Sequence, residues 1–304
     1  MDGVLIDQVR RFNRTVTQRI GALNDAYLAR GRPLGQARLL WEIGSGETEV
    51  RSLRAKLDLD SGYLSRLLRT LEADGLIVVG PDGADGRVRT ARLTPAGLAE
   101  RAELDRLSDE LAASILRPLN QRQRGKLTSA MAEVERLLVA SMVDVAITDP
   151  GHPDARHCLS SYYAELAERF DGGYDPERSP LAGDEVRPPS GVLLVATLHG
   201  DPVGCAGLKF LPDGCAMAKR MWVAPTVRGL GLGRRLLAET ESIAASHGVT
   251  TLRLDTNKAL TEAITLYRSS GFREVASFSD EPYAHHWFEK HLPAQPATGD
   301  PSPA

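Results

Sequence analysis

Apolar residues in the first half of the chain recur at the spacing of amphipathic helices. Between residues 4 and 30 they return close to every 3.6 positions, which predicts a long helix that ends before Gly31 and Pro33. A helix over 61–73 shows the same pattern, since leucines at i, i+3, i+4 and i+7 give it one buried face. Further helices are predicted over 37–43, 50–57, 95–116 and 121–143.

A short β-hairpin is predicted directly after the helix over 61–73. Strands over 76–79 and 87–93 flank the sequence GPDGADG, whose glycines and aspartates are typical of a turn. A helix pair followed by an arginine-bearing hairpin is the order of a winged helix. In that arrangement one helix enters the major groove of DNA and the hairpin tip reaches a minor groove.

The second half of the chain changes to short β-rich runs that alternate with helices. The change comes at TDPGHP, residues 148–153, where proline and glycine interrupt the helical pattern and mark a domain boundary. Residues 172–190 have no regular period, which is typical either of a segment that covers a substrate or of a plain linker. Strands are predicted over 192–198, 203–211, 216–223, 251–254, 273–278 and 286–292, and helices over 154–170, 233–247 and 260–270.

The length of the chain fits two compact domains. Its 304 residues are about twice the commonest domain size. Hydrophobic residues at 42% and charged residues at 25% allow each half a core of its own. We therefore expect one domain over 1–147, a second over 150–292, and a disordered tail over 293–304.

Composition excludes some classes of protein. The chain has no run of 18 apolar residues and no apolar signal segment at its N-terminus, so we expect a cytoplasmic protein without a membrane partner. Cys158, Cys205 and Cys215 lack the spacing of a metal site, so no metal is expected. Residues 1–145 hold 22 Lys and Arg against 20 Asp and Glu, although the whole chain has a net charge of -3. Any nucleic-acid binding therefore belongs to the first half.

The first half resembles the MarR family of winged-helix regulators. The segments LDSGYLSRLLRTLEADGLI, DGRVR and LTPAG carry this resemblance, which covers roughly residues 5–145. It implies a mainly α-helical homodimer with its interface on the first and last helices. Such a dimer places two recognition helices ~34 Å apart on a palindromic operator in double-stranded DNA. Without this resemblance, the arginines on the polar face of the helix over 61–73 would be interpreted as merely solvated. The residues implied to contact DNA are Ser61, Tyr63, Ser65, Arg66, Arg69 and Arg87.

The glycine-rich segment RGLGLG, residues 228–233, lies between a predicted strand and a predicted helix. Glycines let successive backbone N–H groups point at a ligand, and a helix N-terminus favours negative charge, so the segment predicts a site for a pyrophosphate. It departs from the dinucleotide fingerprint G-x-G-x-x-G, because Arg234 stands where the third glycine or alanine belongs.

The segments KRMWVAPTVRGLGLGRRLL, LDTN and AITLYRSSGF resemble the GNAT acetyltransferases over about residues 150–292. This resemblance implies an α/β fold with a mixed sheet, and acetyl-CoA as the cosubstrate. It also implies that the backbone of Met221 and Val223 pairs with the pantetheine arm, and that Asn257 hydrogen-bonds the arm from the next strand. The N–H groups implied to hold the pyrophosphate belong to Arg228, Gly229, Leu230, Gly231, Leu232, Gly233 and Arg234.

Tyr267 occupies the general-acid position of the GNAT resemblance. A phenol with a pKa of ~10 can protonate the departing CoA thiolate when it is within hydrogen-bond reach, and the pKa of a free thiol is ~8.5. The alternative interpretation is that Tyr267 is an amphipathic core residue of its helix. The resemblance leads us to expect a glutamate as general base two residues before Lys219, where this chain has Met217. The remaining candidates for the base are Glu185, Asp255, Asp280 and Glu281.

These motifs predict a bifunctional protein. Its first domain is a DNA-binding transcriptional regulator, and its second is an N-acetyltransferase that acts on a small amine or amino acid by direct acetyl transfer. Two alternatives stay open: an acetyl-CoA or ligand sensor that controls DNA binding with little turnover, and a protein-lysine acetyltransferase delivered to promoters. The aromatic residues interpreted either as acceptor-pocket lining or as ordinary core are Tyr162, Tyr163, Phe170 and Tyr174.

Overall fold

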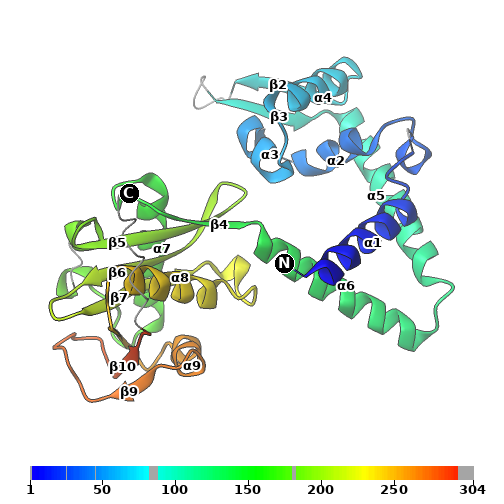
Figure 1. The fold of residues 1–304 in the computed structure, drawn as a ribbon. Coiled ribbons are helices and arrows are strands. Elements are labelled where there is room, and N and C mark those ends of the chain that lie inside the picture. The colour runs from blue at the N-terminus through cyan, green and yellow to red at the C-terminus, as the bar shows by residue number, and fades with distance from the viewer. Residues whose placement is uncertain (1, 25, 45, 82–87, 180–182, 294–304) are drawn as a thin grey trace, which may run out of the picture. The chain divides into compact units, whose positions relative to one another are not determined.

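A computed structural model describes residues 2–24, 26–44, 46–81, 88–179 and 183–293 of the chain. The chain divides into two compact units, Met1–Ala132 and Glu133–Ala304, which are described separately below (Figure 1). Residues 294–304 of the predicted disordered tail lie outside the described residues.

The first unit is built mainly from helices. Its first helix, α1 (Gly3–Arg19), is shorter than the predicted helix, which ran to residue 30. The chain turns at Gly21, whose φ of 69° cannot continue a right-handed helix, and the next helical turn is a 3-10 helix at Tyr27–Ala29. The other helices are α2 (Leu34–Ile43), α3 (Val50–Leu57), α4 (Ser61–Ala73), α5 (Pro95–Leu116) and α6 (Gln121–Ser141), of which α6 runs on into the second unit.

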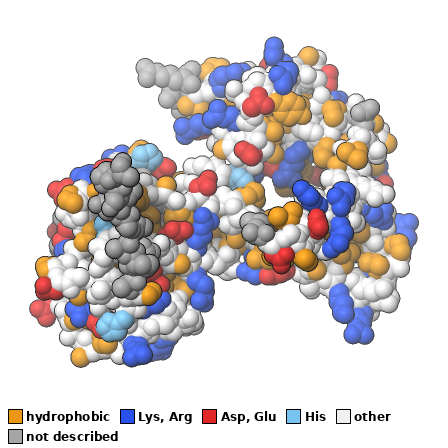
Figure 2. All heavy atoms as spheres, in the orientation of Figure 1, with side chains coloured by type: hydrophobic (Ala, Val, Ile, Leu, Met, Phe, Trp, Pro, Cys, Tyr) orange, Lys and Arg blue, Asp and Glu red, His pale blue; other side chains and the backbone are white. Residues whose placement is uncertain are grey.

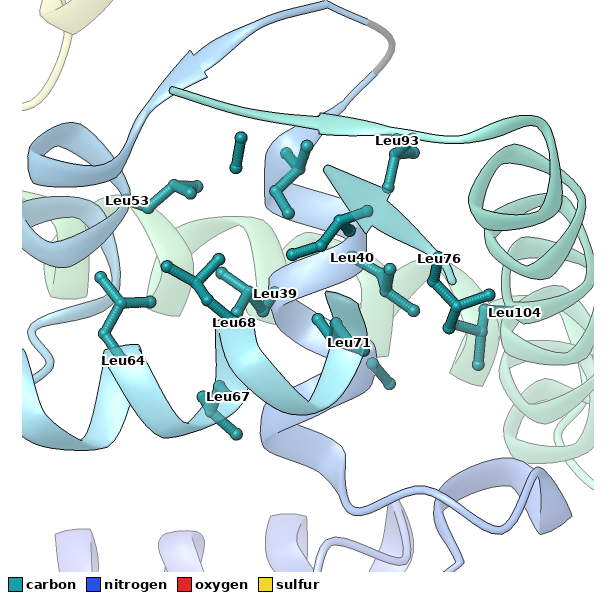
Figure 3. Close-up of a cluster of buried hydrophobic side chains, with 14 residues drawn as sticks. Leu39, Leu40, Leu53, Leu64, Leu67, Leu68, Leu71, Leu76, Leu93 and Leu104 are labelled. Atoms are coloured by element: carbon teal, nitrogen blue, oxygen red, sulfur yellow. The ribbon is translucent and has the colours of Figure 1, made fainter. Parts of the chain in front are cut away.

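Helix α4 has the boundaries that its leucine pattern predicts. The Asp60 carboxylate caps its N-terminus by accepting a hydrogen bond of 2.8 Å from the N–H of Tyr63. The leucine face is buried against α2, α3 and the small sheet, as Figure 3 shows. The buried leucines of α4 are Leu64, Leu67, Leu68 and Leu71. Because one face is fixed in the core, the opposite face of α4 is presented to solvent.

The predicted hairpin is present as β2 (Ile77–Pro81) and β3 (Arg89–Leu93), which pair antiparallel. A two-residue strand that the sequence did not predict, β1 (Thr48–Glu49), pairs with the other edge of β3. The hairpin tip, including the predicted DNA contact Arg87, lies outside the described residues. The first unit thus has the helices and the hairpin strands of the predicted winged helix.

The second unit contains a seven-stranded mixed sheet in the order β4-β5-β6-β7-β8-β10-β9. Strands β7 and β8 are parallel, and the other neighbouring strands are antiparallel. This confirms the predicted α/β class with a mixed sheet. The strands are β4 (Val143–Ile147), β5 (Gly191–Leu198), β6 (Asp201–Phe210), β7 (Cys215–Val223), β8 (Thr251–Thr256), β9 (Arg273–Val275) and β10 (His286–His291).

Strand β4 changes the organisation that the sequence indicated. The helix predicted to residue 143 ends at Ser141, and β4 then pairs antiparallel with β5, with Val143 opposite Leu198. Val143 is buried in the second unit beside Leu194 and Val203. These contacts tie β4 to the second unit, whereas the expected boundary between domains lay after residue 147.

Helices cover both faces of the large sheet. Successive side chains of a strand point to opposite faces, so neighbouring residues of one strand pack on different helices. On one face, Leu193 and Val195 of β5 pack with Ala155 and Cys158 of helix α7. On the other face, Leu194 of β5 packs in a cluster with residues of helix α8. The helices of this unit are α7 (Pro153–Arg169), α8 (Leu232–Ser246) and α9 (Thr261–Ser269). Among the described residues, no helix combines the length and the apolar character that crossing a membrane requires.

Candidate functional site

A cleft lies beside the end of β7, where the parallel strands β7 and β8 separate. They pair only from Cys215 to Met217 on β7, with Thr251 to Arg253 on β8. Beyond this point β7 continues to Val223 while β8 runs on to Thr256 without pairing to it. The cleft has a volume of about 470 Å³ and is lined by α7, the end of β7, the glycine-rich segment, the start of α8 and α9. Residues from the separated ends of both strands line a second pocket that adjoins the cleft. A separated strand edge offers backbone groups to an extended ligand.

The glycine-rich segment forms one wall of this cleft. Gly229 and Gly231 both have a φ of 81°, and each would have open space around an added Cβ. Gly231 is the N-cap residue of α8 and places no side chain over the first N–H groups of that helix. These N–H groups therefore remain available to an anion at a helix N-terminus.

The structure brings most of the predicted cofactor-binding residues together. Those that line the cleft are Met221, Val223, Arg228, Gly229, Gly231, Leu232, Gly233 and Arg234. Leu230 lies within the same loop but does not line the cleft. Asn257 faces the adjoining pocket, and there its amide donates 2.8 Å to the carbonyl of Tyr283 and accepts 2.9 Å from the N–H of Ala259.

Glu165 of α7 braces the arginine that begins the glycine-rich segment. Its carboxylate accepts hydrogen bonds from the Arg228 guanidinium at 2.5 Å and from the Trp222 indole at 3.0 Å. Burial alone would raise the pKa of Glu165, but hydrogen bonds from Arg169 and Arg228 outweigh it and lower the pKa. Arg228 also donates 3.1 Å to the carbonyl of Val223, so its side chain joins α7 to β7. From the sequence, only the N–H of Arg228 was predicted to take part in the site, and Glu165 was not predicted at all.

Tyr267 stands where the cleft meets a second, adjoining pocket. Together with Met221 it lines both, and its hydroxyl lies 4.0 Å from the Met221 sulfur. Burial raises the pKa of Tyr267, and the negative charge of Asp255 raises it further. The phenol is therefore protonated at neutral pH, which is the state that a general acid requires. Its ring also packs in the core of the second unit, so both interpretations of Tyr267 apply to the same side chain.

Two of the four candidate bases lie in the adjoining pocket with Tyr267. The Lys219 ammonium is 3.1 Å from the Asp255 carboxylate and 3.6 Å from that of Glu281. Glu185 pairs with Lys209 on a neighbouring surface, which Asp280 also lines. The structure thus places Asp255 and Glu281, rather than Glu185 and Asp280, beside the predicted acid.

The aperiodic segment 172–190 contributes to this pocket. Tyr174 and Ser179 line it beside Tyr162 and Phe170 of the preceding helix region. The Ser179 hydroxyl donates 2.8 Å to the Glu281 carboxylate. This arrangement favours a segment that covers a substrate over a plain linker. Arg220, Ser179 and Tyr283 also line the pocket and were missed, because no motif surrounds them in the sequence.

In the first unit, the predicted DNA-contacting residues share the exposed face of α4. Ser61, Tyr63, Ser65, Arg66 and Arg69 are all exposed. The Arg66 guanidinium lies over the Tyr63 ring at 5.6 Å from its centroid. On the face shown in Figure 2, Lys and Arg side chains are scattered among acidic and hydrophobic ones rather than gathered in one patch.

Comparisons with known proteins support the family predicted for each half of the chain. Residues 159–272 match the acetyltransferase (GNAT) family. An IAA acetyltransferase from Azospirillum brasilense is 40% identical over 39% of this chain and 78% of its own length. The chain belongs to the GNAT family of acetyltransferases. Residues 30–88 match the MarR family, so the predicted fusion of a MarR region with a GNAT domain is confirmed.

Further relatives cover parts of the chain. An uncharacterized N-acetyltransferase from Schizosaccharomyces pombe is 39% identical over 32% of this chain, which spans 58% of that relative's length. A GNAT-family acetyltransferase from Staphylococcus aureus has 19% identity and a TM-score of 0.44, covering 50% of this chain and 99% of its own. A probable transcriptional regulator from Pseudomonas aeruginosa has 27% identity and a TM-score of 0.37, covering 43% of this chain and 98% of its own. The described residues contain no cluster of three metal-ligating side chains.

Proposed function

We propose that the second unit is an acetyl-CoA-dependent N-acetyltransferase that transfers the acetyl group directly to a small amine or amino acid. The observation that carries the proposal is the cleft at the end of β7, where this strand separates from β8. A glycine-rich helix N-terminus forms one wall of it, and Tyr267 lies where it meets the adjoining pocket. A chain that bound an acyl-CoA without transfer would not need a protonated phenol and two carboxylates beyond the cleft.

The residues of the cleft fit acetyl-CoA, which when bound supplies an acetyl thioester. The N–H groups between Arg228 and Arg234 face an anion without obstruction, because the glycines have open space at the Cβ position. The edge of β7 at Met221 and Val223 would hydrogen-bond the amides of an extended arm. Asn257 stands close enough to the pocket to take part, although its amide is bonded to Tyr283 and Ala259.

The reaction removes two protons from the acceptor ammonium, one before and one after the C–N bond forms, and delivers one proton to the departing sulfur. As the C–N bond forms and the C–S bond breaks, the Tyr267 hydroxyl donates its proton to the thiolate. Asp255 or Glu281 takes the first proton of the acceptor ammonium, directly or through water, and Lys219 holds both carboxylates in place. The second proton leaves the nitrogen after the C–N bond forms and restores the Tyr267 hydroxyl. Met217, which stands where a glutamate was expected, is a buried apolar side chain and takes no part in proton transfer.

The release of CoA thiol tests the proposed activity. The full-length protein is incubated with acetyl-CoA and a panel of amino acids, polyamines and a lysine-containing peptide, while binding of acetyl-CoA is measured by calorimetry. Turnover with a small amine or amino acid supports the proposal. Turnover only with the peptide would instead favour a protein-lysine acetyltransferase. Tight binding without turnover would favour a sensor.

We also propose that the first unit binds a palindromic operator in double-stranded DNA as a homodimer. The exposed face of α4 carries the groups that would contact DNA. Helix α1 supports dimerisation, because its apolar side chains are exposed within the described chain: Val4 is 71% and Val9 is 58% exposed. A second copy would cover this face.

Removing the charge of Arg66 is expected to weaken operator binding. If Arg66 contacts DNA from the exposed face of α4, Arg66→Ala should raise the Kd for the operator about 10-fold. If the contact is to a phosphate, the slope of the logarithm of affinity against the logarithm of salt concentration should also decrease in size by about 1. Gel-shift titrations at several salt concentrations would measure both. Arg106→Ala on α5, an exposed arginine paired with Glu103 and Glu110, is the matched control. Equal Kd values for the two variants would leave α4 as a solvated helix.

A second candidate function, control of DNA binding by acetyl-CoA, is favoured by one contact. Arg136 lies in the part of α6 that belongs to the second unit, and its guanidinium donates 2.8 Å to the carbonyl of Gly229. The carbonyl of Gly229 and the N–H of Leu230 belong to one peptide and point in opposite directions. Arg136 therefore orients an N–H of the proposed pyrophosphate loop. The same helix begins in the first unit.

If this contact transmits cofactor binding, acetyl-CoA should change the operator affinity of the full-length protein by about 5-fold or more. Arg136→Met should remove that change, whereas Arg122→Met, an exposed position on the same helix, should retain it. Fluorescence anisotropy with labelled DNA would measure the affinities. An operator affinity that is the same with and without acetyl-CoA in the unaltered protein would overturn control by acetyl-CoA.

A further inference from the structure

Arg220 is a buried arginine near the middle of β7, in the pocket that adjoins the cleft. It is only 7% exposed and lines the pocket together with Asp255 and Glu281. Its φ is 54°, and the pairing of β6 with β7 shifts register between Cys205 and Gly207. The strand therefore bulges at Arg220, and such bulges re-aim a side chain out of the regular alternation of a strand.

Among the described residues, every hydrogen-bond partner of the Arg220 guanidinium is uncharged. Its Nε donates 3.3 Å to the Tyr163 hydroxyl, and its Nη2 donates to the carbonyl of Ser179 and, at 3.4 Å, to the Ser179 hydroxyl. It also lies over the rings of Tyr162 and Tyr163, at 5.9 and 5.5 Å from their centroids. Within the described part of the chain, Arg220 forms no ion pair, and its Nη1 makes no hydrogen bond.

A buried cation without a counter-charge is costly, because desolvation is not offset by an ion pair. The Tyr174 hydroxyl in the same pocket is also buried and has no hydrogen-bond partner among the described residues. Burial raises the pKa of Tyr174, so this hydroxyl remains a donor at neutral pH. A guanidinium without an ion pair and a hydroxyl without a hydrogen-bond partner, both judged among the described residues, thus line the pocket that contains the proposed acid and base.

The other charged side chains of the pocket carry a net negative charge, which is opposite in sign to the charge of Arg220. Lys219 is shared between Asp255 and Glu281, which leaves one negative charge in excess at that group. Arg220 contributes one positive charge on the other side of the Ser179 hydroxyl, which bonds to both the guanidinium and Glu281. A pocket with one excess charge of each sign is complementary to a molecule that carries an ammonium and a carboxylate.

We propose that the acetyl acceptor is an amino acid whose carboxylate binds the Arg220 guanidinium and the Tyr174 hydroxyl while its amine faces Asp255 and Glu281. This proposal rests on the acetyltransferase function proposed above and specifies the class of its acceptor. The balanced reaction starts from the ammonium form of the amino acid, joins its nitrogen to the acetyl carbon, breaks the thioester C–S bond, and releases CoA thiol and one proton. An amine without a carboxylate would leave Arg220 buried and unpaired.

Matched acceptors test the proposal on the unaltered full-length protein. Each amino acid that supports CoA thiol release is compared with its own carboxamide and with its decarboxylated amine. We expect kcat/KM to be about 100-fold higher for the acid, the size expected for a buried charge-assisted hydrogen bond. Carboxamides or amines used as well as the acids would overturn the proposal, and so would turnover confined to the lysine peptide. In the first case the proposed transfer to a small amine or amino acid would stand, and in the second the chain would be a protein-lysine acetyltransferase instead.

An Arg220→Met variant tests the residue itself. It is expected to raise the KM for the acid about 100-fold, to change the carboxamide reaction little, and to leave acetyl-CoA binding intact, since Arg220 does not line the cleft. Arg253→Met is the matched control, because Arg253 on β8 already pairs with Glu289. A variant that still prefers the acid would overturn the assignment of Arg220. If the variant does not fold, the comparison of acceptors on the unaltered protein decides. Absence of both acetyl-CoA binding and thiol release would instead overturn the acetyltransferase function, and this inference with it.

Discussion

Replacing Tyr267 with phenylalanine is expected to lower kcat by about 100-fold or more, the size of a lost general acid. The hydroxyl lies 4.0 Å from the Met221 sulfur and makes no closer hydrogen bond within the described chain, so its removal leaves the packing of the ring in place. The loss should therefore appear in kcat at saturating acetyl-CoA and acceptor, with little change in the Kd for acetyl-CoA. Steady-state thiol release and calorimetry measure the two quantities.

A matched control is Tyr27→Phe, a partly buried tyrosine in the core of the first unit. It should retain full kcat. The melting temperatures of both variants should stay close to that of the unaltered protein. If Tyr267→Phe turned over at the full rate, Tyr267 would be a core residue alone and the thiolate would take its proton from elsewhere.

The raised pKa of Tyr267 has a consequence for the pH profile of the same reaction. The proton-donating form is the neutral phenol, and burial together with Asp255 holds its pKa above the ordinary value of ~10. The acid therefore stays protonated as the pH rises, and kcat should not fall on the alkaline side below about pH 10 through loss of this proton. A decline near neutral pH that disappears in Tyr267→Phe would contradict this assignment.

Gly231→Glu is expected to weaken acetyl-CoA binding by at least about 100-fold. The position has a φ of 81° and lines the cleft at the N-terminus of α8, with open space where a Cβ would be. A glutamate there would occupy the space in front of the helix and place a negative charge against a pyrophosphate. Calorimetric titration with acetyl-CoA measures the effect.

Gly248→Glu provides a closely matched control. Gly248 follows the other end of α8, has a φ of 75°, and also has open space at the Cβ position. The two variants carry the same backbone strain and the same added charge, so a general loss of stability would affect both. Equal acetyl-CoA affinity in the two variants would show that the glycine-rich loop does not hold the pyrophosphate.

Much of the secondary structure was predictable because local periodicity and turn residues determine it. Helices α3, α4 and α5 begin and end at the predicted residues. The exceptions have two different causes, one local and one not. Helix α1 ends early because the chain turns at Gly21 with a positive φ. Strands β1 and β4 were missed because each is short and is defined by pairing with a strand distant in the sequence.

The residues of the proposed site also fall into two groups, those that local sequence predicts and those that it does not. The glycine-rich segment and Tyr267 lie in motifs of contiguous residues, so they could be named before the fold was known. Glu165, Ser179 and Arg220 carry no such motif. They meet only because α7, the segment after it and β7 converge beside the cleft.

Short-range patterns in the sequence were enough to predict the two families, the helical and β-rich halves, and the glycine-rich segment and Tyr267 as candidate site residues. The folded structure was needed to show that β4 belongs to the second unit and which candidate carboxylates lie beside Tyr267. The same is true of the guanidinium of Arg220, which is buried without a counter-charge in the described structure. Pairing between distant strands, burial and charge balance depend on which residues are neighbours in space. A single sequence does not show which distant residues become neighbours when the chain folds.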